Sequence, residues 1–316
     1  MPGTHASPTA GSTSTPARYA TTADEGDDVP AWFRDAEPPT GSGAVDVRGA
    51  TIRYLTWGPE RGPATVLVHG GGAHAQWWAP LARLIEPIGR VVAMDFSGHG
   101  LSDRRDVYAL AHWTEEVVAV CRAVSDGPAT VVAHSFGGIV STFAATGSHG
   151  AFARVIGVDA PVWPGTPEPP QVMPAPAPGR AERTYPDLAS ALARFRLVPP
   201  QPCANDWYLR HVARHSLHAV SGGWQWRFDP RVFARSTGAR SLARFDDELT
   251  AVRCPLGLVI GADSYLAPSA HRAHSEGKLA VPHRFVPNAG HHVMLDEPLA
   301  LVAQIRRLLA DPRLQP

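Results

Sequence analysis

The fold is decided by residues 129–138, which read ATVVAHSFGG. The apolar, β-branched run 129–133 is typical of a strand at the centre of a parallel sheet, and residues 139–146 have helical spacing. Ser135 is therefore expected on a tight turn between a strand and a helix, where its hydroxyl stands clear of the sheet at the positive end of the helix. A serine in this position is a predicted nucleophile.

Short apolar runs of the same kind occur before and after this turn. They occupy residues 51–57, 64–68, 90–94, 155–158, 256–260 and 284–287. Helical spacing is found in the segments 77–85, 110–124 and 298–309. This alternation predicts an α/β fold in which helices flank a mostly parallel central sheet.

A glycine-rich loop, His69-Gly70-Gly71-Gly72, follows the strand 64–68. Such a run can be a simple turn. Its place at the end of an inner strand, ahead of the Ser135 turn, favours an oxyanion hole instead. The predicted donors are the backbone N–H of Gly71 and that of Phe136, the residue after the nucleophile.

A pair of histidines, His291 and His292, follows the last predicted strand. A serine nucleophile needs a general base, and a histidine on a loop near the C-terminus can reach it. His134 is adjacent to Ser135 and is expected to support the site, because neighbouring side chains on such a turn point apart.

These motifs resemble the α/β-hydrolase superfamily across roughly residues 44–312, and the segment DFSGHGLSD at 95–103 adds to the likeness. The resemblance implies that Ser135 is the nucleophile. It implies that His291 is the base, because His291 follows a glycine and precedes Pro298 by seven residues. It also implies a cap domain inserted after the sixth strand. A serine rather than an aspartate on the turn argues against the dehalogenase and epoxide-hydrolase chemistries of this superfamily.

The acid that orients the base is where the sequence departs from the family pattern. The usual position after the seventh strand holds Ser264, and Asp263 is one residue early. Some relatives carry the acid at the end of the sixth strand instead, where this chain has Asp159. Asp159 is the preferred prediction, and Asp263 remains the alternative.

The domain organisation follows from shifts in composition. Residues 1–28 lack apolar content and are predicted to be a disordered tail. The segments 29–160 and 255–316 form the predicted hydrolase core. Residues 161–254 break the strand–helix rhythm, begin with a proline-rich stretch and are predicted to be a helical cap, or lid.

The cap is expected to close an apolar pocket over Ser135. Its predicted walls contain three tryptophans: Trp163, Trp207 and Trp224. Gly72 and Arg194 complete the predicted substrate contacts. Arg194, or the nearby Arg196, can bind a carboxylate or phosphate of the substrate, whereas the alternative for these arginines is a solvated helix face.

Composition excludes several classes of function. Lys plus Arg and Asp plus Glu each number 29, so no positive excess is available for nucleic acid. Three widely spaced cysteines support neither a disulfide framework nor a zinc site. The chain has no membrane-spanning apolar run and no secretory signal, so a cytoplasmic protein is expected. No cofactor or metal is predicted, and the sequence assigns no oligomeric state.

The predicted function is hydrolysis of a carboxylic ester, lactone or thioester, a small-molecule acyl substrate, through an acyl-enzyme and a Ser-His-Asp triad. Two alternatives stay open. One is a carbon–carbon bond hydrolase of the same fold, which uses a similar triad. The other is a non-catalytic binding protein that keeps the fold.

Overall fold

The computed structural model describes residues 29–147, 150–163, 166, 182–232, 236–237 and 249–315. The predicted tail 1–28 and most of the proline-rich part of the predicted cap lie outside the described residues. Within them, no helix is long and apolar enough to cross a membrane.

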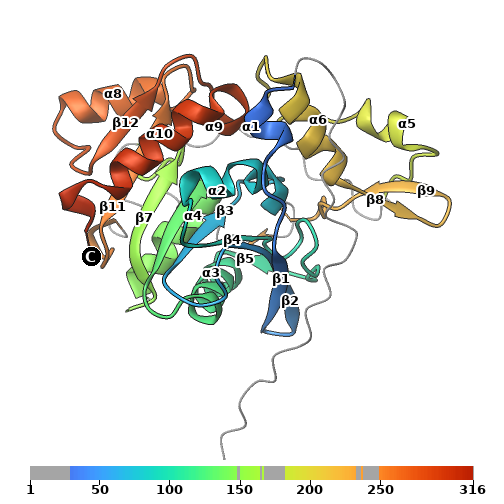
Figure 1. Ribbon diagram of the computed structural model, residues 1–316, viewed down its shortest axis with the longest axis horizontal. Coiled ribbons are helices and arrows are strands. Elements are labelled where there is room, and N and C mark those ends of the chain that lie inside the picture. Colours follow the sequence, from blue (N-terminus) through green and yellow to red (C-terminus); the bar gives the residue numbers. More distant parts are fainter. Residues whose placement is uncertain are drawn as a thin grey trace, which may run out of the picture.

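An eight-stranded sheet forms the centre of the molecule, with the strand order β1-β2-β4-β3-β6-β7-β11-β12 (Figure 1). Its strands are β1 (Gly41–Val47), β2 (Ala50–Trp57), β3 (Ala64–Val68), β4 (Arg90–Met94), β6 (Ala129–His134), β7 (Phe152–Val158), β11 (Leu256–Gly261) and β12 (His283–Val286). β2 is antiparallel to both its neighbours in the sheet. The other strands of the sheet, in the order β4, β3, β6, β7, β11 and β12, are parallel to one another. All residues of β3 and β11 are buried, as expected for parallel strands covered on both faces.

Helices cover both faces of the sheet (Figure 1). Val131 packs in one core cluster with α3 (Leu110–Val124), α4 (Phe136–Gly147) and α8 (Ala267–Ser275). Its neighbour Val132 packs in the other cluster, with α2 (Ala82–Ile85) and α10 (Pro298–Leu309). This alternation follows from the strand period of two, which sends successive side chains to opposite faces.

Smaller elements complete the described chain. They are the helices α1 (Ala31–Arg34) and α9 (Val293–Asp296), the 3₁₀ turns η2 (Ala75–Trp77), η3 (Ala79–Leu81) and η5 (Pro312–Leu314), and the paired strands β5 (Tyr108–Ala109) and β10 (Ser236–Thr237).

The described part of the predicted cap is only partly helical. It contains α5 (Leu188–Leu192), α6 (Asp206–His215) and an antiparallel hairpin of β8 (Leu217–Val220) and β9 (Gly223–Trp226). α6 ends at His215, and the chain then enters the hairpin instead of continuing as a helix. Gly222 and Gly223 have positive φ angles of 88° and 145° and turn the chain back on itself, which produces the hairpin.

Candidate active site

Ser135 lies on the turn between β6 and α4 with a φ angle of +50°, a left-handed conformation that is strained for a serine. Its backbone N–H donates to the Val158 carbonyl over 2.9 Å. Two glycines allow the turn to pack closely. A Cβ on Gly137 would lie 2.4 Å from the His69 carbonyl oxygen, and one on Gly138 would lie 2.3 Å from the Cβ of Ala160. The turn places Ser135 among the residues that line a cavity.

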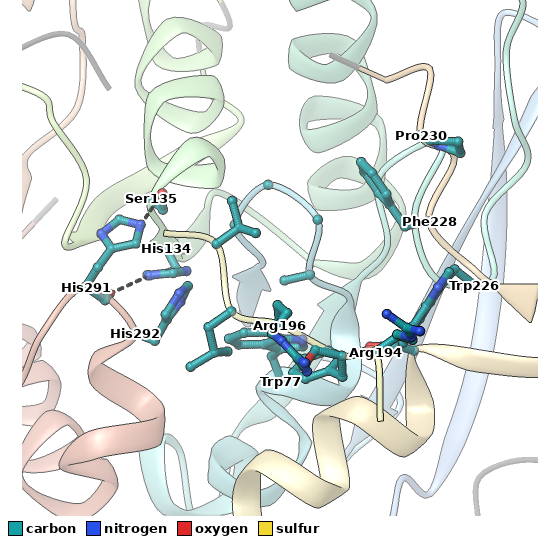
Figure 2. A pocket seen from close by; sticks show the side chains of 18 of the residues that line it. Trp77, His134, Ser135, Arg194, Arg196, Trp226, Phe228, Pro230, His291 and His292 are labelled. Atoms are coloured by element: carbon teal, nitrogen blue, oxygen red, sulfur yellow. Dashed lines mark hydrogen bonds between the residues drawn. The ribbon is translucent and has the colours of Figure 1, made fainter. Parts of the chain in front are cut away.

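His291 lies in the loop between β12 and α9, with its side chain against Ser135 (Figure 2). His291 Nε2 is 2.8 Å from Ser135 Oγ, and Nδ1 is 2.7 Å from Asp159 Oδ2. A carboxylate only accepts hydrogen bonds, so Nδ1 carries the proton and Nε2 accepts from the serine hydroxyl. The neutral ring therefore holds its free lone pair toward the nucleophile.

Asp159 directly follows β7 and is fully buried. Its Oδ1 accepts from the Gly261 N–H over 2.9 Å, and its Oδ2 accepts from the Ser264 hydroxyl over 2.5 Å as well as from His291. These hydrogen bonds offset the free-energy cost of removing the carboxylate from water. The alternative acid, Asp263, is exposed, and its backbone N–H donates to the Ala289 carbonyl. The structure thus pairs His291 with Asp159 rather than Asp263.

The two predicted oxyanion donors come from the loop after β3, which holds Gly71, and from Phe136, which directly follows Ser135. Gly71 and Gly72 line the cavity together with Ser135. Phe136 is the first residue of α4, and the N–H groups of a first helical turn point away from the helix body. The Phe136 ring points elsewhere and packs edge-on against Trp113 at a centroid distance of 5.0 Å. Phe136 itself is not among the described residues that line the cavity.

Two further histidines beside His291 are buried and neutral. Burial and the neighbouring His291 hold the pKa of His134 well below its usual value, and they lower the pKa of His292 to about 3. His134 Nε2–H donates to the His291 carbonyl over 2.9 Å (Figure 2). His292 Nε2–H donates to the Pro199 carbonyl over 3.1 Å. Both rings therefore support the loop that carries His291.

A second set of contacts, which no sequence motif predicted, holds the same loop. Asp296 Oδ2 accepts from the Gly290 N–H and from the Gln201 side-chain amide, each over 2.7 Å. Gln201 Oε1 in turn accepts from the His292 N–H over 3.0 Å. We call Gln201 and Asp296 the loop clamp, because together they bind the residues immediately before and after His291.

The cavity in front of Ser135 has a volume of about 500 Å³. Its aromatic and aliphatic walls include Trp77, Tyr185, Phe195, Leu197, Trp226 and Phe228. The described part of the predicted cap supplies five of these side chains, all but Trp77. Arg194 lines the cavity too, as expected.

The three predicted tryptophans do not line this cavity, and that expectation is wrong. Trp163 is 1% exposed and packs in the core beside the sheet. Trp207 packs against Phe33 at a centroid distance of 4.6 Å, on the side of α6 that faces the N-terminal segment. Trp224 lies beneath the Arg214 guanidinium at 4.9 Å. Each ring buries its apolar face in another contact, so none is available to the cavity.

Comparison with known proteins agrees with this architecture. A family model described as the alpha/beta hydrolase family matches residues 65–305. Esterase Rv0045c of Mycobacterium tuberculosis is 27% identical over 274 residues, which cover 83% of this chain and 88% of the esterase. A solved structure of that esterase has a TM-score of 0.65 at 23% identity and covers 89% of this chain and 96% of its own. The structure of E-2-(acetamidomethylene)succinate hydrolase has a TM-score of 0.70 at 23% identity, with coverages of 85% and 99%. At these identities the two structures establish the fold alone.

Proposed function

Because the chain belongs to the alpha/beta hydrolase family, we propose that it is a serine hydrolase that cleaves a carboxylic ester, lactone or thioester through an acyl-enzyme. The observation that carries the proposal is the continuous hydrogen-bonded series from Ser135 through His291 to Asp159, with contacts of 2.8 and 2.7 Å. Its similarity to an esterase over most of both chains supports the same reaction class.

In the proposed first half-reaction, His291 Nε2 takes the Ser135 proton as Oγ attacks the acyl carbon. Asp159 accepts the Nδ1–H bond, which keeps Nε2 unprotonated before the attack and stabilises the imidazolium that forms. The Gly71 and Phe136 N–H groups are the proposed donors to the tetrahedral oxyanion. The imidazolium then protonates the leaving group, and the acyl group stays on Ser135.

The second half-reaction uses the same groups with water as the nucleophile. His291 takes a proton from water, the resulting hydroxide attacks the acyl carbon, and the proton returns to Ser135 Oγ as the carboxylic acid departs. The neutral state of His134 and His292 suits this scheme, because a charged ring beside His291 would disfavour the imidazolium.

The test combines covalent labelling with turnover. We expect a fluorophosphonate probe to label the protein and p-nitrophenyl acetate to be hydrolysed, and we expect Ser135→Ala to abolish both. Ser269→Ala is the matched control, because Ser269 lies on α8, does not line the cavity, and its hydroxyl donates to the Leu266 carbonyl just before that helix. Absence of both labelling and turnover in the unaltered protein would refute the proposal. Cleavage of a diketone without ester turnover would favour carbon–carbon hydrolysis instead.

A further inference from the structure

The cavity in front of Ser135 carries an excess of positive charge. Its described lining contains three arginines, Arg183, Arg194 and Arg196, and a single carboxylate, Glu182. Glu182 forms an ion pair with Arg104, so its charge is already compensated. The chain as a whole has no formal net charge, and the positive charge at this opening is therefore a local feature.

Arg194 and Arg196 follow α5 on the segment that also supplies the apolar residues Phe195 and Leu197 to the cavity. Within the described part of the chain, neither guanidinium has a carboxylate within 4.0 Å. Arg196 Nη1 donates to the carbonyls of Ala193 and Phe195 over 3.0 and 2.6 Å, which orients the side chain and leaves Nε and Nη2 for another acceptor.

Both side chains lie across the cavity from Ser135, near Trp226 and Trp77 (Figure 2). Leu197 and Val198, which follow Arg196 in the chain, add apolar surface to the lining of the same cavity. A molecule that occupies the cavity thus meets the nucleophile at one end, an apolar surface along its length and guanidinium groups at the other end. Guanidinium groups match carboxylate and phosphate oxygens in charge and geometry.

We propose that the substrate is an ester or thioester with an anionic group, a carboxylate or a phosphate, that is separated from the scissile carbonyl by an apolar chain and binds to Arg194 and Arg196. This inference rests on the proposed function, since it takes Ser135 as the point of attack. It narrows the substrate class within that function.

The test compares esters that differ only at the far end. The probes are p-nitrophenyl hexanoate, mono-p-nitrophenyl adipate and p-nitrophenyl 6-phosphonohexanoate. We expect kcat/KM to be about tenfold higher for at least one anionic ester than for the neutral one, as a charge-assisted hydrogen bond would give. This ratio should fall when NaCl is raised from about 0.05 M to about 0.5 M, because salt screens the attraction. The two anionic probes separate a carboxylate preference from a phosphate preference.

The Arg194→Gln/Arg196→Gln double variant should lower the anionic-to-neutral ratio about tenfold, to near one. Arg210→Gln is the matched control, since Arg210 lies on α6, pairs with Asp206 and does not line the cavity. It should keep the ratio of the unaltered protein. An unaltered ratio near one, or a high ratio that survives the double variant, would overturn the inference.

A binding measurement tests the inference independently of turnover. Monomethyl adipate should bind more tightly than methyl hexanoate to the Ser135→Ala variant in calorimetry, and equal affinities would overturn the inference. Labelling of Ser135 without any preference for anionic esters refutes the inference alone. If the protein is neither labelled nor active but binds the anionic ester tightly, the proposed function is refuted, and the binding of an anionic group at Arg194 and Arg196 is supported.

Discussion

The loop clamp offers a sharp prediction about how the base is held. Gln201→Met keeps the approximate size of the side chain but removes its donor to Asp296 and its acceptor for the His292 N–H, two bonds of 2.7 and 3.0 Å. Hydrogen bonds to charged groups contribute about 1.5–3 kcal/mol and neutral ones about 1 kcal/mol, so about 3 kcal/mol of support is lost from the His291 loop. A shift of about 1 Å in a reacting group costs about 100-fold in rate.

We therefore expect Gln201→Met to lower kcat about 10-fold to 100-fold for p-nitrophenyl acetate. KM should change little, because Gln201 does not line the cavity. Gln315→Met is the matched control. Gln315 Nε2 donates to the Leu309 and Asp311 carbonyls, and neither of these residues belongs to the loop clamp, so the same substitution there should leave kcat nearly unchanged.

Gln201→Glu adds a readout that simple destabilisation would not produce. The new carboxylate would face Asp296, and like charges raise the pKa of one member of such a pair. Its kcat relative to that of the unaltered protein should therefore recover as the pH falls and one carboxyl group takes up a proton. If Gln201→Met lowers Tm but leaves kcat within about twofold, or if Gln201→Glu shows no pH-dependent recovery, the clamp does not position the base.

The remaining predictions concern the acid, the nucleophile turn and the dependence of stability on pH. Asp159→Asn should lower kcat about 10⁴-fold because the base loses its correct tautomer. Asp263→Asn should leave kcat nearly unchanged. If turnover assays show the opposite, Asp263 rather than Asp159 is the acid. Gly138→Ala places a methyl group 2.3 Å from a neighbouring Cβ and should reduce unfolding free energy by about 1–3 kcal/mol in urea titrations, while Gly127→Ala, with nothing within 4 Å, should be tolerated. Burial lowers the pKa of His99 to about 4, so the unfolded chain binds more protons than the native one as the pH falls below about 6.5. Its contribution to unfolding free energy should thus decrease from about pH 6.5 to about pH 4, and a His99→Gln variant should show a flatter pH dependence across that range.

The central elements of the fold were predictable because their side chains carry a clear period. The helix predicted over 110–124 has the same bounds in the structure, and so does the helix over 298–309. Both have one apolar face that packs on the sheet. β1 was not predicted. Its sequence GSGAVDV is an edge strand in which only Val47 is buried, so it has little apolar pattern to detect.

The candidate site was predictable up to choices that depend on three-dimensional contacts. The position of each aspartate after a predicted strand left two candidates for the acid, Asp159 and Asp263. The structure shows that Asp159 contacts His291 and that Gly261 and Ser264 donate hydrogen bonds to it. The loop clamp joins residues about 90 positions apart through polar side chains, which leave no periodic signal.

The walls of the cavity were the least predictable part. Tryptophan is large and apolar whether it faces a cavity or fills a core, and the sequence does not say which side of α6 or β9 is covered. Trp207 and Trp224 are therefore taken up by other contacts, and Trp226 and Phe228 line the cavity instead.

The order of the site residues along the chain has a consequence for synthesis. The ribosome completes the glycine loop, Ser135 and Asp159 before it makes the 161–254 insertion, and His291 emerges only afterwards. The Gly261 and Ser264 donors to the acid also come from this later part, on β11 and the loop that follows it. A nascent or truncated chain that ends before β11 holds a nucleophile without a base and an acid without its donors. Such a chain should be unable to hydrolyse esters while it is still being made, and onset of turnover during translation would report the docking of the last strands.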